Sequence, residues 1–160
     1  MARKILITGM SGLIGGLLKD HLLQDGGYDL KALNRSYVEG VENHQADISD
    51  LDAIKPAFGG QDVVVHLAAY LGSQGWQWQH DNNVLGTYNV FEAARLAGVK
   101  RVIFASSGST IRGFERVKPY KDIADGNYGE VPEDFPMITR DQIRPDALYG
   151  ASKVWGEALG

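Results

Sequence analysis

Residues 5–15 of this chain read ILITGMSGLIG, an apolar run followed by three glycines at three-residue spacing. Residues 4–8 predict a short buried strand, and the apolar residues after Gly12 recur at three- and four-residue steps, which is typical of a helix. In a strand–turn–helix unit, such glycines permit a tight turn and bring backbone N–H groups close to a pyrophosphate. The helix N-terminus adds unpaired N–H groups and a positive dipole end. The stretch therefore predicts a dinucleotide-binding turn, the alternative being a plain βα turn that is rich in glycine.

The composition fits an ordinary globular chain. It has 160 residues, of which 44% are hydrophobic, so a single domain over residues 1–160 can bury a core. Sixteen Lys and Arg against twenty Asp and Glu give a net charge of −4, which argues against a nucleic-acid partner. No cysteine is present, and the four histidines show no metal-ligand spacing, so we expect no metal. The apolar run at 63–71 is too short to cross a membrane, and we expect a cytoplasmic protein.

Short β-rich runs alternate with longer helical patterns, which is the signature of a parallel α/β fold. We predict a Rossmann-type doubly wound parallel sheet with strand order 3-2-1-4-5. Its strands are expected at 4–8, 29–34, 43–46, 63–67 and 101–105. Its helices are expected over 13–22, 51–58, 81–97 and 147–160. Residues 108–146 predict a long irregular loop, which is typical of a functional lid or a disordered excursion.

The aromatic residues before and within the helix at 81–97 also carry predictions. Val84, Tyr88 and Phe91 are expected to form its apolar stripe. Trp76 and Trp78 are expected in a polar loop before it, where they would either wall a sugar pocket or pack on the domain edge.

The end of the second strand bears on cofactor choice. It reads Asn34-Arg35, without the carboxylate that usually bonds the 2′-hydroxyl of NAD. A guanidinium can grip a 2′-phosphate, so Arg35 favours NADP over NAD, although Asn34 can bond a ribose hydroxyl and Arg35 can be a solvated surface residue. Asp47, just past the third strand, can accept a hydrogen bond from an adenine amino group.

A second group of residues predicts acid–base chemistry. Tyr149 and Lys153 lie four positions apart on a predicted helix and therefore share one face. An ammonium group beside a phenol favours the phenolate, which is a suitable general base for a secondary alcohol. Ser106 and Ser107 follow the fifth strand at the edge where open α/β sheets bind ligands. One of their hydroxyls can bond Tyr149 and a substrate oxygen, or simply satisfy backbone groups.

Six short motifs occur in a fixed order along the chain: TGMSGLIG at 8–15, DI at 47–48, HLAA at 66–69, NNV at 82–84, FASS at 104–107 and YGASK at 149–153. In this order they resemble the extended short-chain dehydrogenases/reductases, within the NAD-dependent epimerase/dehydratase group. The run RPDALY at 144–149, with Gly156 and Glu157, is most similar to the uronate dehydrogenases of that group.

The resemblance implies a Ser–Tyr–Lys catalytic set made of Ser107, Tyr149 and Lys153. It implies an oxidoreductase or epimerase that acts on a secondary alcohol of a sugar, sugar acid or nucleotide sugar, and a homodimer through helices 81–97 and 147–160. Asn83 matches a position that supports the active-site architecture in this group, and we expect it among the cofactor-binding residues. The expected cofactor-binding residues are Gly9, Ser11, Gly12, Leu13, Ile14, Gly15, Asn34, Arg35, Asp47, Ile48, Leu67, Ala68, Ala69, Asn83, Tyr149 and Lys153.

The chain departs from the group in ways that support a second hypothesis. The segment between Ser107 and Tyr149 is longer than expected, and members continue beyond Tyr-x-x-x-Lys into further strands and a substrate-binding region. The alternative function is therefore a non-catalytic dinucleotide-binding module, or an inactive fragment of such an enzyme.

Overall fold

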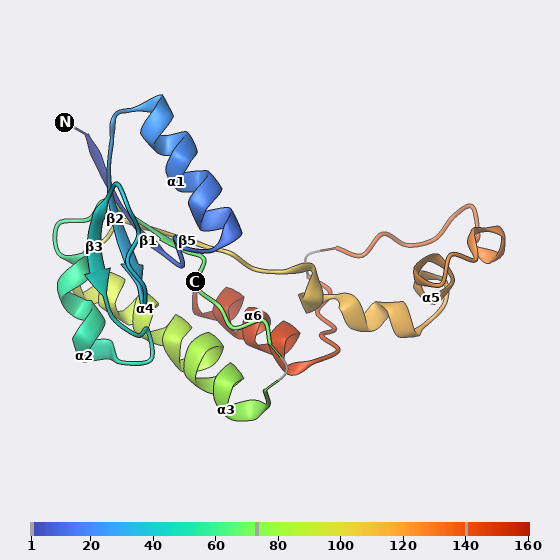
Figure 1. Ribbon diagram of the computed structural model, residues 1–160. Coiled ribbons are helices and arrows are strands. Elements are labelled where there is room, and N and C mark those ends of the chain that lie inside the picture. Colours follow the sequence, from blue (N-terminus) through green and yellow to red (C-terminus); the bar gives the residue numbers. More distant parts are fainter. Residues whose placement is uncertain (1, 73, 140) are drawn as a thin grey trace.

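Five parallel strands form the centre of the computed structural model, which describes residues 2–72, 74–139 and 141–160 (Figure 1). The strands are β1 (Arg3–Thr8), β2 (Tyr28–Asn34), β3 (Glu42–Gln45), β4 (Val63–His66) and β5 (Arg101–Phe104). Their order is β3-β2-β1-β4-β5, and all four pairings are parallel. The predicted doubly wound sheet and its strand order are confirmed.

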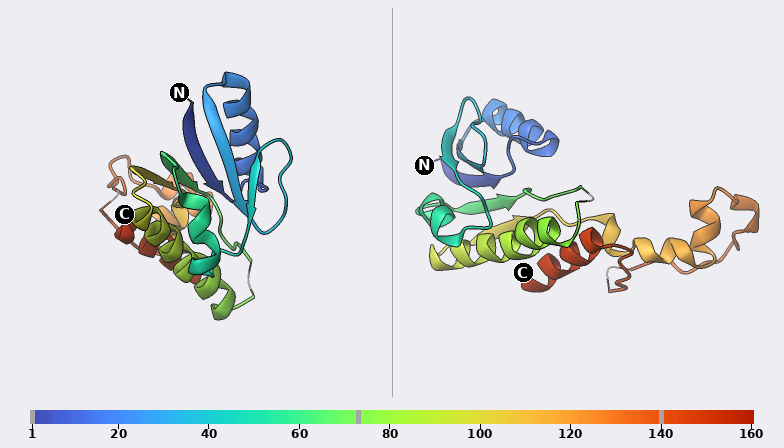
Figure 2. Two further views of the ribbon diagram at one scale, coloured as in Figure 1. Left: turned by 90° about the vertical axis from the view of Figure 1, so that its left-hand side faces the viewer. Right: turned by 60° about the horizontal axis from the view of Figure 1, so that its bottom comes forward.

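Helices cover both faces of this sheet (Figure 2). Helix α1 (Leu13–Asp25) lies on one face, whereas α2 (Leu51–Ile54), α4 (Gly86–Leu96) and α6 (Leu148–Leu159) lie on the other. The alternation of side chains along β1 produces the two cores. Leu6 packs with residues of α2 and α4, while Ile5 and Ile7 pack toward α1.

Two of the predicted helices have different boundaries and types. The α-helical part of the segment predicted at 51–58 ends at Ile54, and Lys55–Phe58 forms a 3-10 turn, η1. Pro56 explains the change, because proline has no N–H for an α-helical hydrogen bond. The helix predicted at 81–97 is the later part of a longer helical segment. This segment begins with α3 (Trp76–Gln79), continues as a π-helical stretch, η2 (His80–Leu85), and ends with α4. The loop predicted for Trp76 and Trp78 is therefore wrong, since both lie on α3.

The predicted stripe of Val84, Tyr88 and Phe91 is not the buried face of this helical segment. Tyr88 is 43% exposed, while the buried residues of α4 include Gly86 and Val90. A Cβ on Gly86 would lie 2.7 Å from the Ile48 side chain. The buried face is thus made mainly of small residues, with Gly86 against Ile48 and with Val90 and Ala93 in the core, so a search for large aromatic and apolar residues selects the wrong face.

Helix α1 buries little of its apolar surface. Gly15 is its buried residue, whereas Leu13 is 81% and Leu17 65% exposed. Ile103 of β5, which pairs with Val65 on the same face of the sheet, is 50% exposed. An apolar surface therefore extends from α1 toward β5.

The segment at 108–146 extends away from the sheet and packs largely on itself (Figure 1). It contains the 3-10 turns η3 (Gly108–Thr110), η4 (Arg112–Arg116) and η5 (Tyr128–Glu130), and the short helix α5 (Tyr120–Ala124). The Tyr120 ring lies 5.6 Å from that of Phe114 and 6.1 Å from that of Phe135, and its hydroxyl donates to Pro136 O at 2.6 Å. Short turns and one short helix interrupt the predicted irregular loop, and these aromatic residues give it a local core.

Candidate cofactor and active site

A cleft of about 520 Å³ lies at the carboxyl ends of the strands, where open α/β sheets bind ligands. With the exception of Asn83, every predicted cofactor-binding residue lines it. Tyr149 and Lys153 therefore open onto the same cleft as the glycine turn, although they lie more than 130 positions later in the sequence. Residues that were not among the expected cofactor-binding residues complete the lining: Leu33, Ser36, Ala46, Leu71, Asn82, Ala105 and Ser106.

The glycine turn has the geometry that the sequence predicts. Gly9 has a φ of +71°, and a Cβ there would lie 2.7 Å from Ala68 N. A Cβ on Gly15 would lie 2.5 Å from Met10 Cα. Gly12 precedes α1 without a side-chain capping hydrogen bond, so the first N–H groups of this helix are available to a ligand. The turn can therefore accept phosphate groups close to its backbone.

The end of β2 carries a second indication of a ligand. Asn34 is only 6% exposed, and its Oδ1 accepts a hydrogen bond from Met10 N at 3.0 Å. Its Nδ2 is buried with no partner among the described residues. A buried donor without a partner is costly, so a ligand oxygen at this position would satisfy it.

Arg35 and Asp47 face each other across the outer part of the cleft. The Arg35 guanidinium lies 3.9 Å from Asp47 Oδ2, and both side chains are exposed. Asp47 Oδ1 also accepts hydrogen bonds from the backbone N and the hydroxyl of Ser49, at 2.9 and 2.8 Å. The arginine is thus held only by a loose surface ion pair, which leaves its guanidinium free to turn toward a phosphate.

His66 connects the cofactor turn to α4 from inside the protein. The Thr8 hydroxyl lies 2.7 Å from its Nδ1, and the Thr87 hydroxyl lies 3.3 Å from its Nε2. Thr8 Oγ1 also accepts a hydrogen bond from Ala68 N at 3.2 Å. Burial lowers the pKa of His66 to about 3, with a smaller effect from the charge of Lys153. A neutral His66 satisfies both hydroxyls if Thr8 donates to Nδ1 and Nε2–H donates to Thr87.

We expect the free energy of unfolding to fall as the pH drops below the ordinary histidine pKa of 6.5. Between that pH and about 3, His66 stays neutral in the folded chain but binds a proton in the unfolded chain, so acid favours unfolding. This one group should contribute a slope of about 1.4 kcal/mol per pH unit. Urea unfolding of the parent chain and of His66→Gln, across this range, would measure it. The exposed His21→Gln is the control, and a slope that His66→Gln leaves unchanged would contradict the assignment.

Lys153 is buried beside the end of β5. It is 4% exposed, and its Nζ donates to Ala105 O at 2.8 Å. Burial lowers the pKa of its ammonium group to about 8, so the group is charged at neutral pH. Its Nζ lies 5.6 Å from the centre of the Tyr149 ring and 4.7 Å from that of Phe104. A positive charge is therefore fixed next to the predicted acid–base residue.

Helix α6 is held closely against β5, which sets the position of Tyr149. A Cβ on Gly156 would clash with the Phe104 ring, and one on Gly150 would clash with Ser109 O. The Glu157 carboxylate accepts a hydrogen bond from the Ser106 hydroxyl. One helical turn before Glu157, Lys153 donates to the carbonyl oxygen of Ala105. Two successive turns of α6 therefore form hydrogen bonds with two successive residues that follow β5. Lys153 and Glu157 lie four positions apart, so their spacing in the sequence already indicates that both side chains lie on the same face of α6.

The two serines after β5 differ in position. Ser106 lines the cleft, whereas Ser107 does not. Ser107 Oγ accepts a hydrogen bond from Ser109 N at 3.1 Å at the start of η3.

Asn83 lies behind the cleft rather than in it. It is 2% exposed, its Oδ1 accepts from Tyr70 N at 2.7 Å, and its Nδ2 donates to Tyr70 O at 2.8 Å and to Gln79 Oε1 at 2.5 Å. Its side chain therefore fixes the backbone that leaves β4, and the cleft residue next to it is Asn82.

Together, the glycine turn and the unpartnered Asn34 amide define a dinucleotide-binding α/β protein, and the Tyr149–Lys153 pair lines the same cleft. The residues fit a nicotinamide dinucleotide in this cleft. Among the described residues, none of the helices is long and apolar enough to span a membrane.

Comparison with known proteins places this site in a family. A model of the NAD dependent epimerase/dehydratase family matches residues 5–160, and the chain belongs to that family. It is 38% identical to the L-arabinose 1-dehydrogenase (NAD(P)(+)) of Haloferax volcanii, covering 100% of this chain and 60% of that protein. It is 31% identical to the uronate dehydrogenase of Agrobacterium fabrum, and the match covers 98% of this chain and 54% of that protein. The similar proteins thus include sugar dehydrogenases and sugar epimerases of this NAD-dependent family.

The solved structures agree with this assignment. A mutant of the Agrobacterium tumefaciens uronate dehydrogenase in complex with NAD is 30% identical, with a TM-score of 0.74 over 99% of this chain and 55% of that chain. The chain therefore spans little more than half the length of the relatives that it matches. The predicted resemblance to the epimerase/dehydratase group and its uronate dehydrogenases is confirmed.

Proposed function

We propose that this chain carries the dinucleotide-binding and acid–base part of an NAD(P)-dependent sugar dehydrogenase. The observation that carries the proposal is the single cleft lined by both the glycine turn and the Tyr149–Lys153 pair. The similarity to an arabinose dehydrogenase and to uronate dehydrogenases supports a sugar or sugar acid as substrate. An epimerase that oxidises its sugar transiently would use the same residues, and a UDP-glucose 4-epimerase of Streptomyces lividans is 33% identical.

In the proposed mechanism, the chain's own residues move the proton and hold the reactants. Tyr149 takes the proton of a secondary alcohol as its phenolate, and Lys153, charged at neutral pH, stabilises that negative charge. Ser107 accepts from the Ser109 N–H, which leaves its own O–H to donate to the substrate oxygen. The glycine turn and Asn34 hold NAD(P), which supplies a hydride acceptor when bound.

Thermal melting of the chain with NAD, NADP or neither tests the binding half of this proposal. A ligand that binds the folded chain alone raises its melting temperature. Dinucleotide reduction with L-arabinose, D-glucuronate and D-galacturonate then tests the catalytic half. A melting temperature that neither dinucleotide shifts would contradict both halves.

A non-catalytic dinucleotide-binding module is the second candidate. It is favoured by the position of Ser107 outside the cleft lining. Binding of a dinucleotide without turnover of any sugar, in a chain that melts cooperatively, would favour this module over the enzyme.

We further propose that the chain prefers NADP, because the exposed, positively charged side chain of Arg35 can bind its 2′-phosphate. Replacing Arg35 with Ser should weaken NADP binding by about 10- to 100-fold, the usual value of a hydrogen bond to a charged group. NAD, which lacks the 2′-phosphate, should bind almost as before. Calorimetric titration of both dinucleotides measures the ratio, with Arg112→Ser as a control for charge. An equal loss for NAD and NADP would refute this role.

The exposed apolar residues of α4 and α6 support a homodimer as the working assembly. Tyr88 and Leu96 on α4 and Trp155 on α6 are 43%, 54% and 42% exposed. We propose that these helices, at 81–97 and 147–160, pair with the same helices of a second copy. Analytical ultracentrifugation tests the assembly, and a monomer at all concentrations would contradict it.

A further inference from the structure

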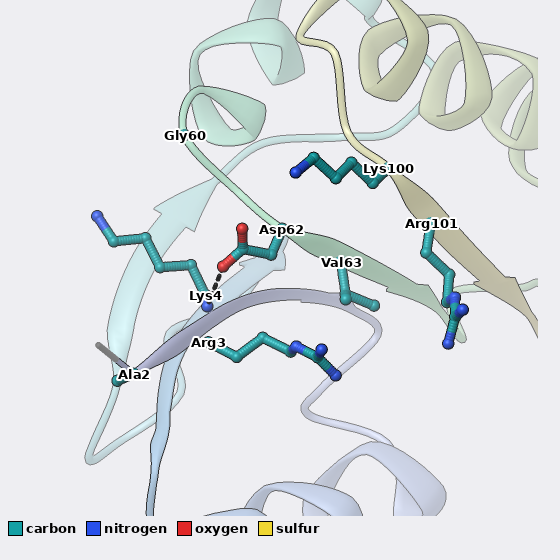
Figure 3. Close-up of a pocket in the computed structure, with 8 residues that line it drawn as sticks. All are labelled: Ala2, Arg3, Lys4, Gly60, Asp62, Val63, Lys100 and Arg101. Carbon is teal, nitrogen blue, oxygen red and sulfur yellow. Dashed lines mark hydrogen bonds between the residues drawn. The ribbon is translucent and has the colours of Figure 1, made fainter.

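A second cleft lies at the opposite end of the sheet from the cofactor turn (Figure 3). It is formed by the amino ends of β1, β4 and β5 and has a volume of about 620 Å³, within the range of small-molecule sites. Two cations come from β1, Arg3 and Lys4, and two more, Lys100 and Arg101, come from the start of β5. The proposed function uses none of these residues.

The four cations are held close together by the sheet and are not neutralised. Within residues 2–72, 74–139 and 141–160, none of them forms an ion pair. The one carboxylate in the cleft, Asp62, accepts a hydrogen bond from the backbone N of Lys4 at 2.9 Å. The two cation-bearing strands, β1 and β5, flank β4, so their positive charges meet at one end of the sheet and would attract an anion that entered the cleft.

The strand register places the cations in two sets around the strand ends. Val63 pairs with both Ile5 and Arg101, so Arg3 and Arg101 extend on the face of Val63. Lys4 and Lys100 extend on the opposite face, as Figure 3 shows. A guanidinium pair thus lies on one side of the strand ends, and an ammonium pair lies on the other.

The rest of the molecule argues for a compact anion. Four cations and one carboxylate give the cleft a formal charge of +3, while the whole chain carries −4, so the remaining residues carry −7. An extended polyanion such as a nucleic acid would meet that acidic surface and be repelled. A small anion would sense chiefly the four nearby cations, because screening limits the range of the other charges to about 8 Å at physiological salt.

We propose that this cleft binds a small molecule carrying phosphate groups, separately from the dinucleotide. Arg3 and Arg101, on one face of the strand ends, present planar forks that match phosphate oxygens, and Lys4 and Lys100, on the other face, add positive charge at longer range. The shared chemistry is a diphosphate group, either as inorganic pyrophosphate or as part of a nucleotide.

The test is calorimetric titration of the chain with pyrophosphate and with a nucleoside diphosphate, at constant ionic strength and with saturating NAD(P). We expect one site with a dissociation constant below about 1 mM. The Arg3→Gln/Arg101→Gln variant should bind the anion at least about tenfold more weakly. It should also melt no lower than the parent, because it removes repulsion. Arg95→Gln/Arg112→Gln, which removes two charges elsewhere, and Arg35→Gln, at the cofactor cleft, should bind as the parent does.

Each outcome decides the matter. Tighter binding of the nucleotide identifies a nucleotide as the ligand, and equal binding identifies the free anion. The proposal is overturned if titration with either anion releases no more heat than titration with sodium chloride at equal ionic strength. It is also overturned by anion binding that Arg35→Gln abolishes and Arg3→Gln/Arg101→Gln retains, since the anion would then occupy the cofactor cleft. If the arginine variant does not fold, Lys4→Gln/Lys100→Gln must also bind the anion more weakly.

Discussion

Replacing Tyr149 with Phe is expected to reduce sugar-dependent dinucleotide reduction by about 10²- to 10⁴-fold, the usual contribution of a positioned general acid or base. The ring would keep its place beside Lys153, because the phenyl group retains the shape and the contacts of the phenol ring. What is lost is the phenol oxygen that takes the substrate proton in the proposed mechanism. The measurement is the initial rate of reduction at saturating dinucleotide and sugar.

The control separates chemistry from binding. Tyr149→Phe should change the dinucleotide dissociation constant by less than about tenfold, since it removes at most one neutral hydrogen bond. Tyr128→Phe, at an exposed position on η5 away from the cleft, should change neither quantity. A rate for Tyr149→Phe within tenfold of the parent rate would exclude Tyr149 as the acid–base group.

Replacing Gly15 with Ala is expected to have the largest effect on stability. A Cβ there would lie 2.5 Å from Met10 Cα and even closer to Gly9 O, both in the backbone of the turn. Neither atom belongs to a flexible side chain, so α1 must move away from β1. We expect a loss of about 3 kcal/mol. Because the melting temperature of a domain this size shifts by about 2–4 °C per kcal/mol, it should fall by about 6–12 °C.

The neighbouring glycine offers a matched control of opposite sign. A Cβ on Gly16 would lie 4.0 Å from its nearest neighbour, Met10 O. Because alanine has the higher helix propensity, Gly16→Ala should stabilise α1 by about 0.5–1 kcal/mol. Urea unfolding of the two variants measures both changes. Similar effects at the two positions would mean that the close packing of α1 on the turn does not decide stability.

The sequence alone predicted the parallel sheet, its strand order and nearly all of the cofactor cleft. The strands, helices and glycine turn depend on local patterns, namely apolar runs of strand length, helical periodicity and glycines at fixed spacing. The strand order belongs to the fold type that was expected, and most of the cofactor residues were expected from the resemblance to the epimerase/dehydratase group. Strand boundaries agree within a residue or two, since Gly9 and other turn residues mark where each run ends. The Tyr149–Lys153 pair was also visible, because i and i+4 share a helix face.

The tertiary structure decided what depends on residues distant in sequence. It showed that the buried face of α4 combines Val90 and alanines with Gly86 and polar residues, whereas the larger Tyr88 is exposed. It also showed that Asn83 uses its amide on the Tyr70 backbone.

The basic cleft illustrates the same limit most clearly. Arg3 and Lys4 are separated from Lys100 and Arg101 by nearly a hundred residues. Only the pairing of β1 and β5 with β4 brings their charges to one end of the sheet. Local sequence determines which element a segment forms, because propensity and periodicity act over a few residues. Which side chains share a cleft is decided by strand pairing and packing, since these join segments that no local pattern relates.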